Sequence, residues 1–280
     1  MTLTKEEFQL WTKYIHDTTG IFLDDSKGYL IETRFDTLIK ETASTSFGDL
    51  LSKVKADYTY HLRKKVIEAI TTNETSFFRD TSPFDLLQNK ILPDLIDKRT
   101  KTLGRITPLP IRIWSAASST GQEVYSISIV LKELLIDLSK YDIRILGTDI
   151  SNQAVAKASY AHYSRMELDR GMTADKLSRY FTTDGTVWKV KDELRALSTF
   201  KTMNLLEPFS FPTKFDIIFC RNVAIYFTEA DKTRLFQKIG QVLAPDGFLI
   251  IGSTESITTC CPLFEPKRYL RSLFYQLKSV

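Results

Sequence analysis

The sequence predicts a small all-helical N-terminal domain followed by an α/β domain whose sheet is mostly parallel. Two observations lead to this fold class. All nine prolines of the 280-residue chain lie after residue 82, and apolar residues before that point recur at helical spacing. After it, short apolar runs typical of buried strands alternate with helical patterns, and such alternation indicates a parallel sheet covered by helices.

The N-terminal segment carries three apolar stripes with the spacing of amphipathic helices. They cover residues 8–15, 30–39 and 62–70. Gly20, Gly28 and Gly48 lie between these stripes or near their ends, where turns are expected. We therefore expect the following organisation: a helical domain over 1–70, a linker carrying an active-site motif over 71–84, and the larger domain over 85–280.

Four apolar runs predict the main strands of the larger domain: 111–114, 143–146, 215–219 and 248–251. Helical patterns follow them: 122–138, a helix from a Ser151 N-cap through 158, and a helix from a Thr228 N-cap through 243. Pro245-Asp246-Gly247 predicts a turn into the last strand. Extended segments around Tyr269 and Phe274 indicate an antiparallel ending.

Residues 180–203 interrupt this alternation. Three short pieces with β-strand composition cover 180–183, 187–190 and 199–202, and Asp184-Gly185 separates the first two. We expect the three pieces to form a small β-subdomain that leaves the main domain and returns to it.

Composition is that of a globular protein of the cytoplasm. No apolar run approaches the roughly 18 residues of a membrane helix, and the N-terminus lacks the apolar core of a signal peptide. The three cysteines and three histidines show no zinc-ligand spacing, so we expect no metal site and no disulfide. A net charge of +4 is too small to indicate a nucleic-acid partner.

Small or polar residues follow three of the predicted strands, at 115–123, 148–149 and 220–222. Because ligands of parallel sheets bind beyond the carboxyl ends of the strands, these segments could line one pocket. Asp149 could accept hydrogen bonds from ribose hydroxyls, or it could merely stabilise a helix N-terminus. The other segments, and the linker 72–79, could also be packing turns. Neither a G-x-G-x-x-G nor a Walker lysine pattern is present.

Five motifs in sequence order resemble the chemotaxis receptor glutamate methyltransferases, the CheR family. They are Asn-x-Thr-x-Phe-Phe-Arg from residue 73, Ser-Ala-Ala-x-Ser-Thr-Gly-x-Glu from 115, Thr-Asp-Ile from 148, Phe-Cys-Arg-Asn-Val-x-Ile-Tyr-Phe from 219 and Leu-x-Pro-Asp-Gly from 243. The resemblance spans nearly the whole chain and is strongest from Asn73 onward.

The resemblance implies a Rossmann-like class I methyltransferase fold that uses S-adenosylmethionine and releases S-adenosylhomocysteine. Carried over by motif, the residues around the cofactor are Asn73, Thr75, Arg79, Glu123, Asp149, Asn204, Leu205, Asn222 and Val223. Arg79 and Tyr226 are expected nearest the transferable methyl group, as the catalytic residues. Gln122 and Val124 stand where the family often has Glu and Pro, whereas Glu123 is retained.

The same resemblance implies methyl transfer to glutamate carboxylates on the cytoplasmic helices of chemoreceptors, by a monomer that does not insert into the membrane. Because such a carboxylate is already ionised at pH 7, no general base is required, and orientation becomes the main task. Two other classes stay open: a methyltransferase for a small metabolite and a non-catalytic adaptor that senses the cofactor.

Two further expectations concern the receptor. Some family members bind a receptor C-terminal pentapeptide as an added strand and have a longer, glycine-containing loop in the β-subdomain. Here the link over 182–186 is short, so we expect no dependence on such a tether. Arg63, Lys64 and Lys65 lie near the domain junction, where they could dock the receptor or simply form a solvated helix face.

Overall fold

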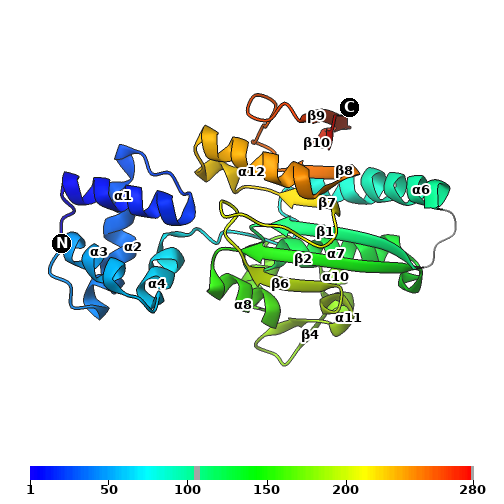
Figure 1. The fold of residues 1–280 in the computed structure, drawn as a ribbon. Coiled ribbons are helices and arrows are strands. Elements are labelled where there is room, and N and C mark those ends of the chain that lie inside the picture. The colour runs from blue at the N-terminus through cyan, green and yellow to red at the C-terminus, as the bar shows by residue number, and fades with distance from the viewer. Residues whose placement is uncertain (104–107, 279–280) are drawn as a thin grey trace.

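The computed structural model describes residues 1–103 and 108–278, which form two parts joined by an extended segment (Figure 1). The first part contains α1 (Lys5–Thr19), the 3₁₀ turn η1 (Asp25–Lys27), α2 (Gly28–Glu41), α3 (Phe47–Ala56) and α4 (His61–Ile70). Their inner faces share one core. The predicted helical domain is confirmed, and α3 is a helix that the three apolar stripes did not include.

The ends of α1 follow from its sequence. Thr4 and Glu7 form a reciprocal capping box at its N-terminus. Gly20 ends the helix with a φ of 79°, a left-handed conformation that favours glycine. Inside the bundle, the indole N–H of Trp11 donates to the Phe47 carbonyl at 2.9 Å, which joins α1 to the start of α3.

The second part is built on a seven-stranded sheet. Its strands are β1 (Leu109–Ala116), β2 (Tyr141–Asp149), β6 (Ser198–Thr202), β7 (Phe215–Cys220), β8 (Leu243–Ile251), β9 (Phe264–Tyr269) and β10 (Ser272–Leu277). They lie in the order β6-β2-β1-β7-β8-β10-β9. The first five are parallel, and β10 and β9 are antiparallel, as the sequence predicted.

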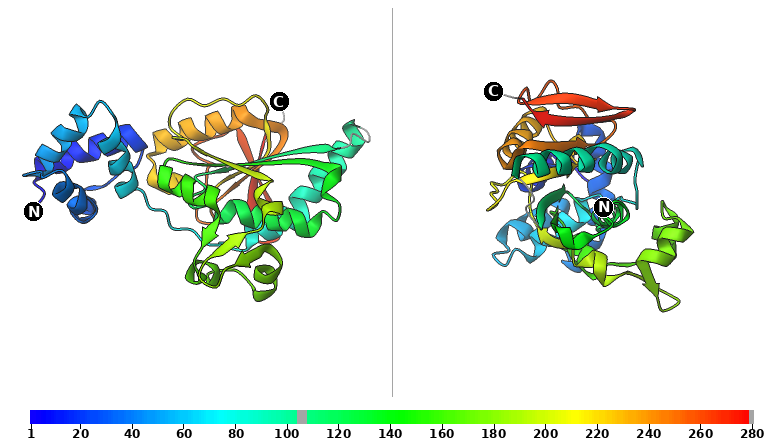
Figure 2. Two further views of the ribbon diagram at one scale, coloured as in Figure 1. Left: turned by 90° about the horizontal axis from the view of Figure 1, so that it is seen from below. Right: turned by 90° about the vertical axis from the view of Figure 1, so that its right-hand side faces the viewer.

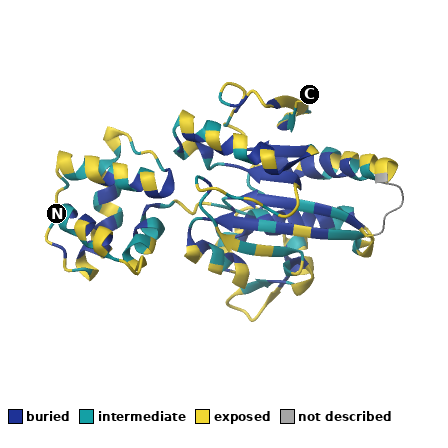
Figure 3. Ribbon diagram, viewed as in Figure 1, coloured by how far each residue is buried: buried dark blue, intermediate teal, exposed yellow. Residues whose placement is uncertain are grey.

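Helices cover both faces of this sheet (Figure 2). They are α5 (Ser82–Leu86), the π-helical turn η2 (Leu87–Ile91), α6 (Leu92–Leu103), α7 (Gln122–Leu134), the 3₁₀ turn η3 (Leu138–Lys140), α8 (Asn152–Tyr160) and α12 (Glu229–Val242). The sheet has a hydrophobic core on each face, and alternate residues of β1 belong to different cores. Ile113 packs with α7 on one face, and Trp114 packs with α12 on the other. The central strands are accordingly buried, while edge strands β6 and β9 are more exposed and the helices expose their outer faces (Figure 3).

A small antiparallel sheet projects from the main one, in the order β3-β5-β4. It contains β3 (His162–Tyr163), β4 (Phe181–Thr183) and β5 (Trp188–Val190), with α9 (Arg165–Asp169), α10 (Ala174–Tyr180) and α11 (Asp192–Arg195) around it. The prediction that 199–202 belongs to this sheet is wrong. Those residues lie in β6, which runs parallel to β2 and pairs with its outer edge, and β3 completes the small sheet instead.

Two boundaries also differ from the prediction. The turn expected at 245–247 is instead a bulge within β8. Phe215 pairs with Leu243 and Ile217 pairs with Phe248, so the residues of β8 between these two pairs are out of register with β7. The helix expected over 122–138 ends at Leu134, before the 3₁₀ turn η3.

Several polar contacts, including the following three, set the helical part against the carboxyl edge of the sheet. The Asn204 amide donates to the Thr18 carbonyl at 3.0 Å, and His16 Nε2 lies 2.8 Å from Asp231 Oδ2. Glu68 on α4 accepts a hydrogen bond from the Gln153 backbone of α8 at 3.1 Å. In the described residues, no helix is both long enough and apolar enough to cross a membrane.

Candidate active site

The loop after β1 curls back toward the sheet. Ala117, Ser119 and Gly121 have left-handed backbone conformations, with φ of 62°, 49° and 95°. A Cβ on Gly121 would lie 2.9 Å from the Ala158 Cβ of α8, so this approach favours glycine. The curl directs the Ser119 amide toward Asp149 at the end of β2.

Two backbone amides hold the Asp149 carboxylate. The Ser119 N–H donates to Oδ2 at 2.8 Å, and the Ser151 N–H donates to Oδ1 at 3.0 Å. Burial raises the pKa of Asp149 above its ordinary value, and the two amides act in the opposite direction. Because each carboxylate oxygen has two lone pairs, the side chain can still accept hydrogen bonds from a ligand's hydroxyls.

Glu123 in the first turn of α7 and Arg221 after β7 form a buried ion pair, with Nη1 2.9 Å from Oε2. Arg221 Nη2 also donates to the Asp80 carboxylate and to the Arg79 carbonyl, both at 2.9 Å. The second Glu123 oxygen accepts a hydrogen bond from the Ser115 hydroxyl at 2.8 Å. Arg221 therefore connects the linker, α7 and the end of β7.

Replacing Arg221 with leucine is expected to lower the free energy of unfolding by about 3 kcal/mol, because Glu123 and Asp80 lose their cation. The side chain of Asp80 is 38% exposed, and solvent screens its interaction with Arg221. The expected loss of unfolding free energy is therefore near the lower end of the range for broken buried ion pairs. Arg170→Leu is the matched control: its ion pair with Glu74 is exposed, and the change should stay within about 0.5 kcal/mol. Denaturant titration measures both, and equal losses would contradict the buried role.

The turn after β7 depends on a carboxylate from a distant loop. Asn222 has a left-handed φ of 56°, and its N–H donates to Glu255 Oε2 at 2.7 Å. The other Glu255 oxygen accepts a hydrogen bond from the Ile225 N–H at 3.2 Å. The turn continues into η4 (Ala224–Tyr226), so Glu255 fixes the backbone that carries Tyr226.

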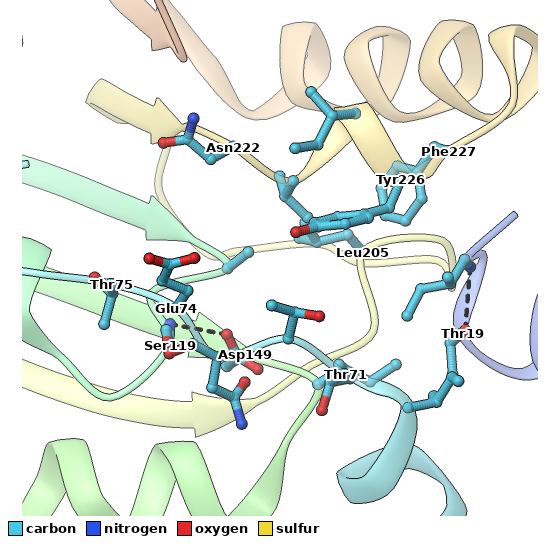
Figure 4. A pocket seen from close by; sticks show the side chains of 18 of the residues that line it. Thr19, Thr71, Glu74, Thr75, Ser119, Asp149, Leu205, Asn222, Tyr226 and Phe227 are labelled. Atoms are coloured by element: carbon cyan, nitrogen blue, oxygen red, sulfur yellow. Dashed lines mark hydrogen bonds between the residues drawn. The ribbon is translucent and has the colours of Figure 1, made fainter. Parts of the chain in front are cut away.

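These elements enclose a cavity of about 460 Å³, which extends to the helical part of the chain. All ten residues singled out from the sequence line it: Asn73, Thr75, Arg79, Glu123, Asp149, Asn204, Leu205, Asn222, Val223 and Tyr226. Asp149 and Tyr226 extend from opposite walls (Figure 4). Cavities of this size take small molecules or cofactors.

Arg79 and Asn204 differ in how much of each side chain is free for a ligand. Arg79 Nη1 donates to the Glu74 carbonyl at 3.0 Å, and the other guanidinium donors have no partner among the described residues. The Asn204 amide is engaged at both ends, since Nδ2 donates to Thr18 and Oδ1 accepts from the Leu206 N–H at 3.0 Å. The Asn204 side chain thus mainly holds its segment against α1.

Sequence reasoning missed the contribution of the helical part to the cavity. That part provides these lining residues: Thr19, Ile21, Phe22, Leu23, Asp24, Lys27, Leu30, Arg34 and Ile70. In a sequence, apolar residues at a cavity mouth cannot be told from apolar residues on the inner face of a helix. The one available signal is Gly20, whose left-handed conformation forms the turn that brings this segment to the cavity. Arg221 and Glu255 were likewise not identified as supports of the site.

The basic residues near the domain junction are partly engaged within the helical part. Lys65 forms an ion pair with Glu41 at 2.6 Å, and the Arg63 guanidinium lies over the Tyr60 ring. These contacts favour a solvated helix face for Arg63 and Lys65, while Lys64 is exposed. Within residues 1–103 and 108–278, no group of three or more His, Cys, Asp or Glu side chains could hold a metal ion.

Comparison with known proteins adds two family matches. Residues 6–71 match the all-alpha domain of CheR methyltransferases, and residues 73–268 match their S-adenosylmethionine-binding domain. Among curated relatives, a chemotaxis protein methyltransferase of Vibrio parahaemolyticus is 36% identical over 99% of both chains. Chemotaxis protein methyltransferase Cher2 of Pseudomonas putida is 34% identical over 97% of this chain and 98% of its own.

Solved structures of other methyltransferases are similar to the chain at lower scores. The magnesium protoporphyrin IX methyltransferase of Synechocystis with bound S-adenosylmethionine has a TM-score of 0.40 and 14% identity, over 87% of this chain and 96% of its own. The glycopeptide N-methyltransferase MtfA with bound S-adenosylmethionine has a TM-score of 0.33 and 12% identity, over 55% of this chain and 48% of its own.

Proposed function

This chain belongs to the CheR methyltransferase family, and on that premise we propose that it methylates glutamate side chains of chemoreceptors. The methyl donor is S-adenosylmethionine, and the products are glutamate methyl esters and S-adenosylhomocysteine. One observation carries the proposal: the Arg79 guanidinium lines the same cavity as Asp149 and Glu123 and retains donors for an acceptor carboxylate. The proposal includes action as a monomer in the cytoplasm, on the cytoplasmic helices of the receptor.

The cavity residues fit S-adenosylmethionine by their chemistry. Asp149 offers a carboxylate to the ribose hydroxyls of the cofactor. Glu123 offers a second carboxylate to the ammonium group of its methionine part. Leu205 and Val223 offer apolar contact to the adenine ring. When bound, the cofactor supplies an activated methyl group.

The protein's own task is to bind and orient the acceptor. Since a glutamate carboxylate is ionised at neutral pH, no side chain has to remove a proton. Arg79 can hold one acceptor oxygen by charge-assisted hydrogen bonds and leave the other oxygen to attack. Tyr226 lies on the wall opposite Asp149, where its ring can exclude water and its hydroxyl can fix the acceptor (Figure 4). Such orientation lowers the barrier by reducing its entropic part.

Transfer of labelled methyl groups to purified receptor tests the proposal. Label in the receptor that is released by mild base is expected, because methyl esters hydrolyse under these conditions. A methyltransferase for a small metabolite would label only low-molecular-weight material, and a non-catalytic adaptor would bind the cofactor without any transfer. The helical part at the cavity mouth favours a protein acceptor, and the presence of both Arg79 and Tyr226 favours a catalyst.

We also propose that the enzyme acts without a receptor pentapeptide tether. In the small sheet, β5 lies between β3 and β4, so a peptide could add only at the outer edge of one of these two short strands. Residues 184–187 form the tight link between β4 and β5. Asp184 accepts hydrogen bonds from the Thr186 and Val187 amides, both at 3.0 Å, and these hold its pKa at about 2. A link closed on itself in this way leaves little backbone to wrap around a peptide.

Titration with C-terminal pentapeptides of the host receptors is therefore expected to give no saturable binding in the micromolar range, as measured by calorimetry. Receptor lacking its last five residues should be methylated as fast as the intact receptor. Without a tether, those residues do not raise the effective concentration of enzyme near its substrate, so their removal costs nothing. Peptides with the same residues in scrambled order serve as the control. Micromolar binding of the natural peptide alone would contradict the proposal.

A further inference from the structure

Two large apolar side chains stand open at the cavity described above. Phe22 is 57% exposed and Ile225 is 51% exposed, and both residues line the cavity. They come from different parts of the chain, one after α1 and the other from η4. The Phe22 N–H donates to the carbonyl of Tyr226, the residue after Ile225, at 2.8 Å, so the Phe22 backbone lies beside the end of η4. Single exposed apolar residues are ordinary, but a pair at the mouth of a binding cavity indicates a contact surface.

The backbones of both residues are firmly held although their side chains are open. Gly20, two residues before Phe22, packs so closely on Leu206 that an added Cβ would lie 2.1 Å from a Leu206 methyl carbon. The Ile225 N–H donates to Glu255 at 3.2 Å. A partner that binds here therefore meets a preorganised surface, which reduces the entropic cost of binding.

A cation lies at the same cavity. Lys27, the last residue of η1, lines it and forms no ion pair within 4 Å among the described residues, although its charge acts on the nearby carboxyl of Asp24, which also lines the cavity. An apolar pair with a free lysine complements a helix that presents apolar and acidic residues on one face. On such a helix, residues three or four positions apart lie about 5–6 Å from each other. A glutamate inside the cavity would thus place a neighbour one turn away at its mouth.

Resting on the proposed function, we infer that Phe22, Ile225 and Lys27 form a recognition rim for the acceptor helix. Phe22 and Ile225 pack an apolar side chain one turn from the methylated glutamate, and Lys27 contacts a second carboxylate of the same helix. The rim selects among glutamates by their neighbours, whereas Arg79 acts on the reacting carboxylate itself.

Steady-state methylation of purified receptor by the full-length enzyme tests this inference. Phe22→Ala and Ile225→Ala are each expected to raise the KM for receptor about tenfold, with kcat and the Kd for S-adenosylmethionine changed by less than about twofold. Phe22→Leu should recover most of the loss because it restores apolar surface. Lys27→Ala should raise KM less and weaken its dependence on salt.

Leu10→Ala is the matched control, since Leu10 is 51% exposed on α1 but does not line the cavity. It should leave the KM unchanged, and melting curves should coincide for all variants. If the rim variants match the control, or if their cofactor Kd rises in parallel with KM, the inference is wrong. A wild-type enzyme that labels no receptor would instead overturn the proposed function, so the two failures are distinguishable.

Discussion

Arg79→Ala is expected to slow methyl transfer to receptor by about a hundredfold or more while changing the affinity for S-adenosylmethionine by less than about fivefold. On the proposed mechanism, the guanidinium donors of Arg79 that are not engaged with Glu74 would meet a partner only when an acceptor carboxylate enters the cavity. The linker should keep its place in this variant, because Arg221 bonds to the backbone carbonyl of Arg79 rather than to its side chain. Isothermal calorimetry and single-turnover transfer separate the two effects.

Arg79→Lys and Arg170→Ala are the controls for this result. Lysine keeps the charge without the planar fork, so an intermediate rate is expected. Arg170 has an exposed ion pair with Glu74 on the same linker, and its loss should leave the rate unchanged. If cofactor binding and turnover fall in parallel in Arg79→Ala, the acceptor role is wrong.

Asp149→Ala is expected to weaken S-adenosylmethionine and S-adenosylhomocysteine by about 1.5–3 kcal/mol each, roughly 10- to 150-fold, which is typical of lost hydrogen bonds to a charged group. Both ligands should weaken equally, because they share the ribose that Asp149 is proposed to hold. The matched control is Asp142→Ala in the same strand, whose carboxylate pairs with Arg112 and does not line the cavity. Unchanged affinity in Asp149→Ala would remove this residue from the site.

The affinity should also depend on pH. Burial raises the pKa of Asp149 above its ordinary value, and an ionised carboxylate accepts hydrogen bonds better than a protonated one. Cofactor affinity is therefore expected to fall as the pH is lowered through that raised pKa. Asp149→Ala should lack this dependence. Calorimetry across the acidic range, at pH values where melting curves show both proteins folded, measures the difference.

The main sheet could be predicted because its strands are nearly continuous apolar runs that end in polar residues. Ile217 and Ile218 are buried on opposite faces, and Asp149 is the last residue of β2. Edge strand β6 could not be assigned in the same way. Its residues are exposed or half-buried, and it follows the small sheet closely in sequence. Its composition is therefore as compatible with a strand of the small sheet as with an edge strand of the main sheet.

The supports of the site were harder to infer than its lining. Arg221 and Asn222 are neighbours in one motif and both line the cavity, yet the Arg221 side chain is held in an ion-pair network with Glu123 and Asp80, while Asn222 forms a left-handed turn. Nothing in a linear sequence separates a ligand-binding residue from the neighbour that holds it. Phe22 was missed for a related reason, because its place at the cavity depends on how the helical part packs on the sheet.

Mapping the methylated residue by mass spectrometry tests the central claim most directly. Purified receptor is incubated with the enzyme and S-adenosylmethionine, digested at acidic pH to preserve esters, and sequenced by fragmentation. A mass gain of one methylene is expected on glutamates of the cytoplasmic helices, removed by mild base and nearly absent with Arg79→Ala. Methylation confined to lysine, arginine or cysteine, or glutamate esters formed equally well by Arg79→Ala, would contradict it.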